Sequence, residues 1–143
     1  MNPLPPVSQI LRRVNYSETD QMGVVYHARY LVWFDEARTE HIRRTGVTYR
    51  DLEARGVLLV VGELRVRYRQ PARYDDEVRI RCWVRDCASR RVTFGYAVER
   101  CADDQLLVTA ETGMMALNRS FTSARLPEEV IRLLPATPDP VRL

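Results

Sequence analysis

The stretch YSETDQMGVVYHARY, Tyr16–Tyr30, joins a predicted strand to a predicted long helix and contains one of the two histidines of the chain. A connection that only reverses the chain direction needs glycine or asparagine. This connection also carries Asp20 and His27, a carboxylate and an imidazole seven residues apart. Its composition therefore indicates a chemical role in addition to the turn.

The residues around this junction have the periodicities of one strand, one long helix and then four more strands. The first strand is predicted over Ile10–Tyr16, and apolar residues at helical spacing predict the helix over Tyr30–Arg44. Thr48 begins a short second helix that ends near Gly56. Side chains then alternate with period two within 63–69, 77–84 and 92–98, a last strand is predicted over Leu106–Leu117, and a closing helix spans Pro127–Leu134.

Short connections between consecutive strands favour antiparallel pairing, and one helix on one face of such a sheet gives an α+β domain. The 143 residues predict a single domain over 1–143, with loose proline-containing ends at about 1–8 and 135–143. Arg65, Arg67 and Arg69 alternate on the other face of the sheet. We expect that face to be solvated or paired in an oligomer.

The composition narrows the class of protein. The N-terminus has no signal pattern and the apolar runs are too short for a membrane span, so we predict a cytoplasmic protein. Three cysteines without a CxxC pair predict buried thiols, and we expect no metal and no cofactor. The net charge of +3 is too small to indicate nucleic acid as a partner.

The junction is the best candidate for chemistry in the sequence. Asp20 comes just before the turn Gln21–Gly23, and His27 lies at the expected start of the helix. The backbone N–H groups at a helix N-terminus can stabilise an oxyanion, and a nearby carboxylate can act as nucleophile or base. These residues favour acyl transfer or hydrolysis. An aspartate that only forms the turn and a structural histidine are the alternative interpretation.

The same stretch resembles the signature of the hotdog-fold thioesterases, and more narrowly the YbgC-like and 4-hydroxybenzoyl-CoA thioesterase group. The resemblance continues through Phe34–Arg38, FDEAR, and through Tyr68–Asp76, YRQPARYDD, and covers roughly residues 10–118 in order. It implies a curved five-stranded antiparallel sheet wrapped around a long central helix. It also implies homodimers or homotetramers with active sites between protomers, and an acyl-CoA substrate.

The resemblance also assigns residues. It places the catalytic carboxylate at Asp20, the histidine at His27 and a tyrosine, more suited to positioning than to chemistry, at Tyr16. The expected substrate-pocket residues are Gly23, Val24, Tyr30 and Asp35, and the expected arginines for the phosphates of coenzyme A are Arg90, Arg91, Arg119 and Arg125. Glu18 replaces the first acid of the family's usual Asp-Thr-Asp and leaves Asp20 unchanged.

The predicted function is the hydrolysis of an acyl-CoA thioester to a free acid and coenzyme A, which is part of the substrate. Asp20 either attacks the carbonyl carbon or activates a water molecule, and the sequence favours neither route. Two alternatives stay open. One is a thioesterase for acyl groups on an acyl carrier protein, and the other is a hotdog module that binds acyl-CoA without hydrolysing it.

Overall fold

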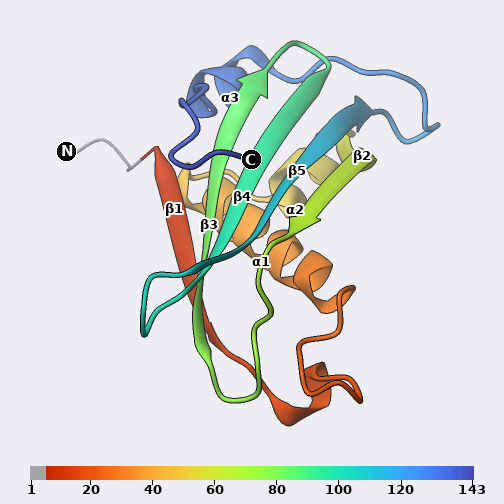
Figure 1. The fold of residues 1–143 in the computed structure, drawn as a ribbon. Coiled ribbons are helices and arrows are strands. Elements are labelled where there is room, and N and C mark those ends of the chain that lie inside the picture. The colour runs from red at the N-terminus through yellow and green to blue at the C-terminus, as the bar shows by residue number, and fades with distance from the viewer. Residues whose placement is uncertain (1–5) are drawn as a thin grey trace.

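The computed structural model describes residues 6–143. Five strands form one antiparallel sheet in the order β1-β3-β4-β5-β2. The strands are β1 Val7–Arg13, β2 Leu58–Tyr68, β3 Glu77–Cys87, β4 Arg91–Arg100 and β5 Leu106–Leu117, and the helices are α1 Arg29–Arg44, α2 Tyr49–Ala54 and α3 Glu128–Leu133. Figure 1 shows the sheet curving around α1. The predicted α+β architecture, a curved five-stranded antiparallel sheet around a long helix, is confirmed.

The core lies between α1 and the concave face of the sheet. The alternation predicted from the sequence turns Val78, Ile80 and Phe94 toward the helix, and all three are fully buried. Trp33 and Phe34 of α1 belong to the same apolar cluster. Because each fully buried side chain of this size contributes about 1.5–3 kcal/mol, this layer holds α1 on the sheet.

One charged side chain, Arg38 of α1, is buried in this layer. Its guanidinium donates hydrogen bonds to the hydroxyl oxygens of Tyr49 at 2.7 Å and Tyr96 at 3.0 Å, and to the carboxylate of Asp35 at 2.6 Å. A buried cation without partners costs several kcal/mol, so these bonds are what allow the charge inside the core.

The first strand ends earlier than the sequence pattern predicts. We expected it over Ile10–Tyr16, whereas β1 stops at Arg13 and a 3₁₀ turn spans Tyr16–Glu18. The backbone N–H of Asn15 donates to the carboxylate of Glu18 at 2.8 Å, which caps this turn and ends the strand. The side chain of Tyr16 is consequently 78% exposed instead of lying in a strand.

The C-terminal segment lies on the outer face of the sheet, away from α1 (Figure 1). Its Thr137 N–H donates to the carbonyl of Val84 at 2.8 Å, and its Asp139 accepts the indole N–H of Trp83 at 2.9 Å. Residues 135–143, which we expected to be loose, are held because Asp139 is also ion-paired with Arg85 at 2.8 Å.

At the other end, Val7 and Ser8 belong to β1, whereas residues 1–5 lie outside the described part of the chain. Within 6–143, no helix combines the length and the apolar character needed to cross a membrane. No group of three or more His, Cys, Asp or Glu side chains in that range could hold a metal ion. Cys82 is a buried thiol as expected, but Cys87 and Cys101 are only half-buried.

Candidate active site

The turn that carries Asp20 is closed by its own backbone. The N–H of Asp20 donates to the carbonyl of Val24 at 2.9 Å, and the N–H of Gly23 donates to the carbonyl of Asp20 at 3.0 Å. Gly23 has a φ of 78°, a left-handed conformation that strains residues with a Cβ. The carboxylate of Asp20 accepts the N–H of Met22 at 2.8 Å, and it forms no ion pair with any residue in 6–143. The turn thus fixes Asp20 without neutralising it.

Glu18 braces this turn against the long helix. Its carboxylate accepts the indole N–H of Trp33, buried on α1, at 2.9 Å. Its carbonyl accepts the N–H of Tyr26 at 2.8 Å. Glu18, which replaces the family's usual first acid, therefore links the turn to the long helix. The sequence did not predict this role. Its only signal in the sequence is the capping spacing from Asn15 to Glu18.

His27 lies just before the long helix, because α1 begins at Arg29. The N–H of Arg29 donates to the carbonyl of Tyr26 at 2.8 Å and closes the turn that leads into the helix. No hydrogen bond within the described residues uses the backbone N–H of His27. A free N–H beside the positive end of a helix dipole is a suitable donor to an oxyanion.

A cavity of about 340 Å³ brings these groups together, and we call it the loop cavity. It is lined by Asp20, Met22, Val24, Val25, His27, Tyr30, Tyr68, Arg69, Gln70 and Pro71. Its volume falls in the range of about 300–1,000 Å³ that is common for small-molecule sites. A carboxylate and an imidazole stand in a mainly apolar and aromatic wall, which is suited to an acyl group with one reactive carbonyl.

The end of β2 and the turn after it form the opposite wall of the loop cavity. The N–H of Val25 donates to the carbonyl of Ala72 at 2.9 Å, and the N–H of Ala72 donates to the hydroxyl of Tyr30 at 3.2 Å. The hydroxyl of Tyr68 donates to the carbonyl of His27 at 2.8 Å. These bonds bring together the two stretches that carry the family resemblance, Tyr16–Tyr30 and Tyr68–Asp76.

The predicted site residues divide into those inside and those outside this cavity. Asp20, Val24, His27 and Tyr30 line it. Gly23 shapes the turn, and Tyr16 packs edge-on against Tyr74 with ring centres 5.6 Å apart. Asp35 is ion-paired with Arg38 at 2.6 Å. Six further residues line the cavity without having been predicted, although all of them belong to the two quoted stretches, Tyr16–Tyr30 and Tyr68–Asp76: Met22, Val25, Tyr68, Arg69, Gln70 and Pro71.

The four arginines predicted to bind coenzyme A are exposed and lie toward the opposite end of the sheet. Arg91 is paired with Met115 on β5, whereas Tyr68 is paired with Val108. Seven residues of β5 separate the two positions, which is roughly 23 Å at about 3.3 Å per residue. Arg90 donates to Ser123, Arg91 to Glu63 and Arg119 to the carbonyl of Glu53, and Arg125 is exposed.

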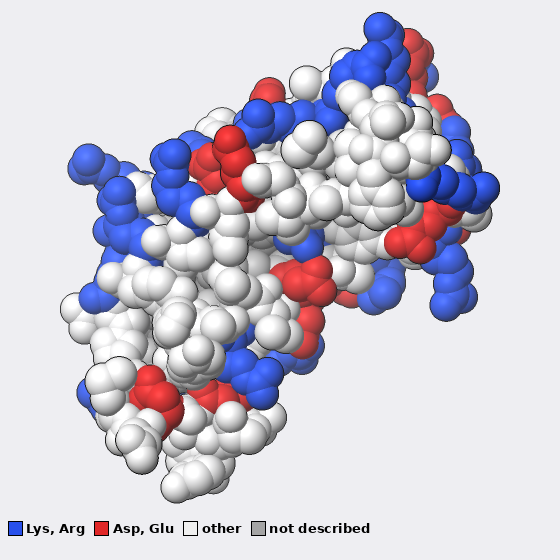
Figure 2. Space-filling model, turned by 90° about the vertical axis from the view of Figure 1, so that its right-hand side faces the viewer, with Lys and Arg blue, Asp and Glu red and all other residues white. Residues whose placement is uncertain are grey.

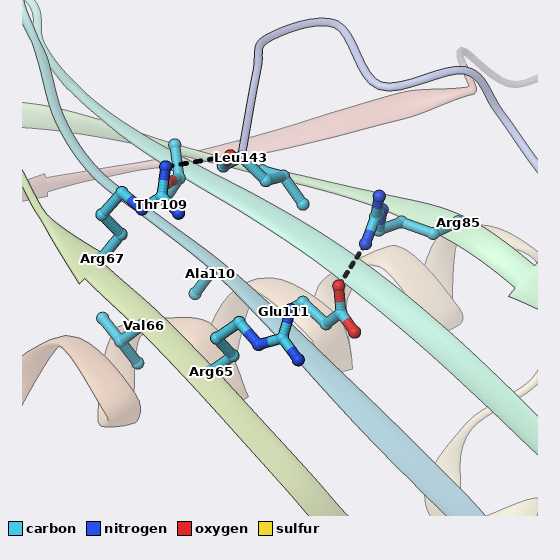
Figure 3. Close-up of a pocket in the computed structure, with 8 residues that line it drawn as sticks. All are labelled: Arg65, Val66, Arg67, Arg85, Thr109, Ala110, Glu111 and Leu143. Atoms are coloured by element: carbon cyan, nitrogen blue, oxygen red, sulfur yellow. Dashed lines mark hydrogen bonds and ion pairs between the residues drawn. The ribbon is translucent and has the colours of Figure 1, made fainter.

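A second cavity, of about 320 Å³, lies on the outer face of the sheet, and we call it the outer cavity. Figure 3 shows Arg65 and Arg67 from β2, Arg85 from β3 and Glu111 from β5 around it, with Leu143 of the C-terminal segment at its edge. Arg85 is ion-paired with Glu111. The carboxylate of the outer cavity is therefore neutralised, and no histidine lines it.

The sequence model of the thioesterase-like superfamily matches residues 14–134, a range that includes every residue of the loop cavity. The chain belongs to the thioesterase-like superfamily. It is 32% identical over 120 residues to the acyl-CoA thioester hydrolase YbgC of Escherichia coli O6:H1, which covers 83% of this chain and 89% of that protein. The predicted membership of the YbgC-like group is thereby confirmed.

Two solved structures superpose on most of the chain. The hypothetical protein TT1821 from Thermus thermophilus has a TM-score of 0.82 and 38% identity, with 90% of this chain and 95% of that chain covered. The DHNA-CoA thioesterase from Staphylococcus aureus has a TM-score of 0.79 and 30% identity, with 83% of this chain and 80% of that chain covered. These superpositions agree with the hotdog arrangement of sheet and helix.

Proposed function

We propose that the chain hydrolyses acyl-CoA thioesters to a free acid and coenzyme A, in the cytoplasm and as a homo-oligomer. The observation that carries this proposal is the carboxylate of Asp20, which lines the loop cavity beside His27 and has no ion-pair partner within 6–143. The reaction class is supported by membership of the thioesterase-like superfamily and by the name of the E. coli relative.

In the proposed reaction, the thioester carbonyl binds with its oxygen toward the backbone N–H of His27. That oxygen becomes negative as the tetrahedral intermediate forms, and a fixed N–H donor at the start of a helix stabilises it. Asp20 either attacks the carbonyl carbon to give an anhydride that water opens, or takes a proton from the attacking water. In both routes the carbon–sulfur bond breaks, and the thiolate of coenzyme A leaves and is protonated.

The remaining predicted residues receive positioning roles in this proposal. The imidazole of His27 orients the thioester or the water, which it can reach because it lines the loop cavity. Tyr16 and Asp35 lie outside the loop cavity of one protomer. We assign them to the part of the site that a second protomer completes.

The flank that carries β2 is the surface we propose for the second protomer. β2 is an edge strand, paired only with β5 among the described strands. Exposed apolar side chains lie on it and beside its end: Met22, Tyr26, Val61, Leu64 and Tyr68. Figure 2 shows a broad uncharged area on this flank. A free strand edge with apolar neighbours is satisfied when two copies of β2 pair antiparallel.

This antiparallel pairing also gives the distant arginines a function. It places the Leu58 end of one β2 beside the Tyr68 end of the other. The end of the sheet that carries Arg90 and Arg91 in one protomer then approaches the loop cavity of the other. We propose that these arginines bind the phosphates of coenzyme A there, because guanidinium groups form bidentate bonds with phosphate.

The activity is tested by continuous measurement of thiol release from a series of acyl-CoA esters. We expect many turnovers per protomer with at least one ester, whereas binding without thiol release contradicts the hydrolase and supports the binding module. The same acyl group on coenzyme A and on an acyl carrier protein separates the two enzyme alternatives. Light scattering at micromolar concentration tests the assembly, and a fully active monomer contradicts the shared site.

A further inference from the structure

We propose that Tyr68 is a positioning residue for the reaction, which holds the peptide that follows His27 through its phenol hydroxyl. Tyr68 is the last residue of β2 and lines the loop cavity. It lies 41 positions from His27 in the sequence, and its hydroxyl is 2.8 Å from the carbonyl oxygen of His27. The inference rests on the proposed hydrolysis and adds a residue that the family resemblance did not assign.

The hydrogen bond fixes the segment between the turn that carries Asp20 and the helix at the carbonyl of His27, which no other hydrogen bond within 6–143 uses. The N–H of Tyr26 is bound to the carbonyl of Glu18, and the carbonyl of Tyr26 is bound to the N–H of Arg29, both at 2.8 Å. The next peptide unit, which begins with the carbonyl of His27, lies before the first residue of α1. Because peptide units are planar, the Tyr68 bond orients the unit that follows the Cα of His27, and the bond from Arg29 to Tyr26 orients the unit that precedes it and carries the N–H of His27. With both units held, the direction in which the imidazole leaves the backbone is set.

The ring of Tyr68 restrains the side chains of the cavity as well. It stands edge-on to the imidazole of His27, with centres 6.4 Å apart, and to the ring of Tyr30, with centres 5.6 Å apart. Burial raises the pKa of Tyr68 above its ordinary value of 10.0, so the phenol keeps its proton and remains a donor at neutral pH. The hydroxyl and the ring of Tyr68 therefore have separable roles. The hydroxyl holds the carbonyl of His27, and the ring packs against the side chains that line the loop cavity.

Tyr68→Phe tests the hydroxyl alone, because phenylalanine keeps the ring that lines the cavity. We expect kcat to fall about fivefold, which corresponds to the net value of about 1 kcal/mol for one hydrogen bond, while KM stays within about twofold. We also expect faster amide hydrogen exchange in the peptide that covers residues 24–30. A side chain that only contributed to stability would lower the melting temperature and leave kcat unchanged.

Tyr49→Phe is the matched control. It removes a phenol hydroxyl that accepts a hydrogen bond from Arg38 at 2.7 Å, and Tyr49 does not line the loop cavity. We expect this variant to lose stability without a change in kcat or in exchange over residues 24–30.

Two results overturn the inference: an unchanged kcat in folded Tyr68→Phe, or a reduced kcat with unchanged exchange over residues 24–30. A wild-type protein that releases thiol from no acyl-CoA contradicts the proposed function instead. In that case the exchange measurement still decides whether Tyr68 holds this segment, since it does not depend on activity.

Discussion

The loop cavity and the outer cavity are nearly equal in size, about 340 and 320 Å³, but their carboxylates have opposite surroundings. Asp20 in the loop cavity accepts one backbone N–H and has no guanidinium partner within 6–143, whereas Glu111 in the outer cavity is ion-paired with Arg85. A paired carboxylate is a weak nucleophile and a weak base, because the cation stabilises its charged form. The free carboxylate, and not the volume, is what distinguishes the proposed active site from the outer cavity.

Charged residues that line the outer cavity also hold the C-terminal segment, residues 135–143. Arg85 is ion-paired with both Glu111 and Asp139, and Asp139 also accepts the indole N–H of Trp83 at 2.9 Å. Hydrogen bonding to Asp139 raises the pKa of Arg85 further above its ordinary range. We therefore expect substitutions in the loop cavity to change turnover and substitutions at the outer cavity to change stability.

The largest expected effect is that of Asp20→Asn. Asparagine can still accept the N–H of Met22 and serve in the turn, but it lacks the charge that nucleophilic and base catalysis both require. We expect turnover to fall by at least about a hundredfold in a folded protein.

Glu111→Gln is the matched control in the outer cavity, and we expect its turnover to stay within about twofold of wild type, because Glu111 lies outside the loop cavity. Thiol release and thermal melting are measured on the same preparations. Near-normal turnover in folded Asp20→Asn would remove the distinction between the two cavities.

The second effect is that of His27→Ala, which sharpens the roles inside the loop cavity. An imidazole that orients the thioester or water can be partly replaced by solvent, so we expect turnover to fall by about tenfold, less than for Asp20→Asn. Steady-state kinetics with one acyl-CoA ester compares the two variants directly. If the histidine variant is the less active one, the roles of the two residues are reversed.

Asp139→Ala tests the contact that holds the C-terminal segment on the outer face of the sheet. It leaves the buried indole N–H of Trp83 without its partner and removes one of the two anions beside Arg85. We expect the free energy of unfolding to fall by about 1–3 kcal/mol, the range for an unsatisfied buried donor. Denaturant unfolding gives this value, and turnover is expected within about twofold of wild type. A large loss of turnover would show that the two regions are coupled.

The smallest expected effect is the pH dependence of the stability that Asp139 contributes through its contacts with Arg85 and Trp83. Burial acts to raise the pKa of Asp139, but hydrogen bonds from Arg85 and Trp83 outweigh it, so the pKa lies below its ordinary value of 3.8. A carboxyl whose folded pKa is depressed stabilises the fold above its unfolded pKa and loses that contribution as the pH falls through the folded pKa. We expect the stability difference between wild type and Asp139→Asn to shrink below about pH 3.8. A difference that grows on acidification contradicts this assignment.

Local patterns predicted most of the fold. Alternating apolar residues located β3 and β4 because the two faces of a strand meet different environments, and β5 spans Leu106–Leu117 as predicted. The pattern failed at β1, where the contact of Asn15 with Glu18 ends the strand before Tyr16. Nothing in the periodicity of a strand records such a cap.

The residues that line the loop cavity were predictable only where they are close in sequence. Asp20 and His27 share one turn, and the turn chemistry of Gly23 is visible in the sequence. Tyr68 reaches His27 from 41 positions away, so its contact depends on how the end of β2 packs on the start of α1. The same reason applies to Asp139, whose contact with Trp83 spans 56 positions. Contacts of this kind follow from the assembled sheet and not from any local pattern.

The two tryptophans of the chain offer a separate optical reporter for each region. Trp33 donates its indole N–H to Glu18 at the turn that carries Asp20, and Trp83 donates its indole N–H to Asp139 under the C-terminal segment, each at 2.9 Å. Both rings are buried, so the emission of each depends on whether its carboxylate stays in contact. In Trp83→Phe the remaining fluorescence follows the turn that carries Asp20 when an acyl-CoA ester is added. In Trp33→Phe it follows the release of the C-terminal segment. Measurements on the two variants therefore show which of the two regions changes first.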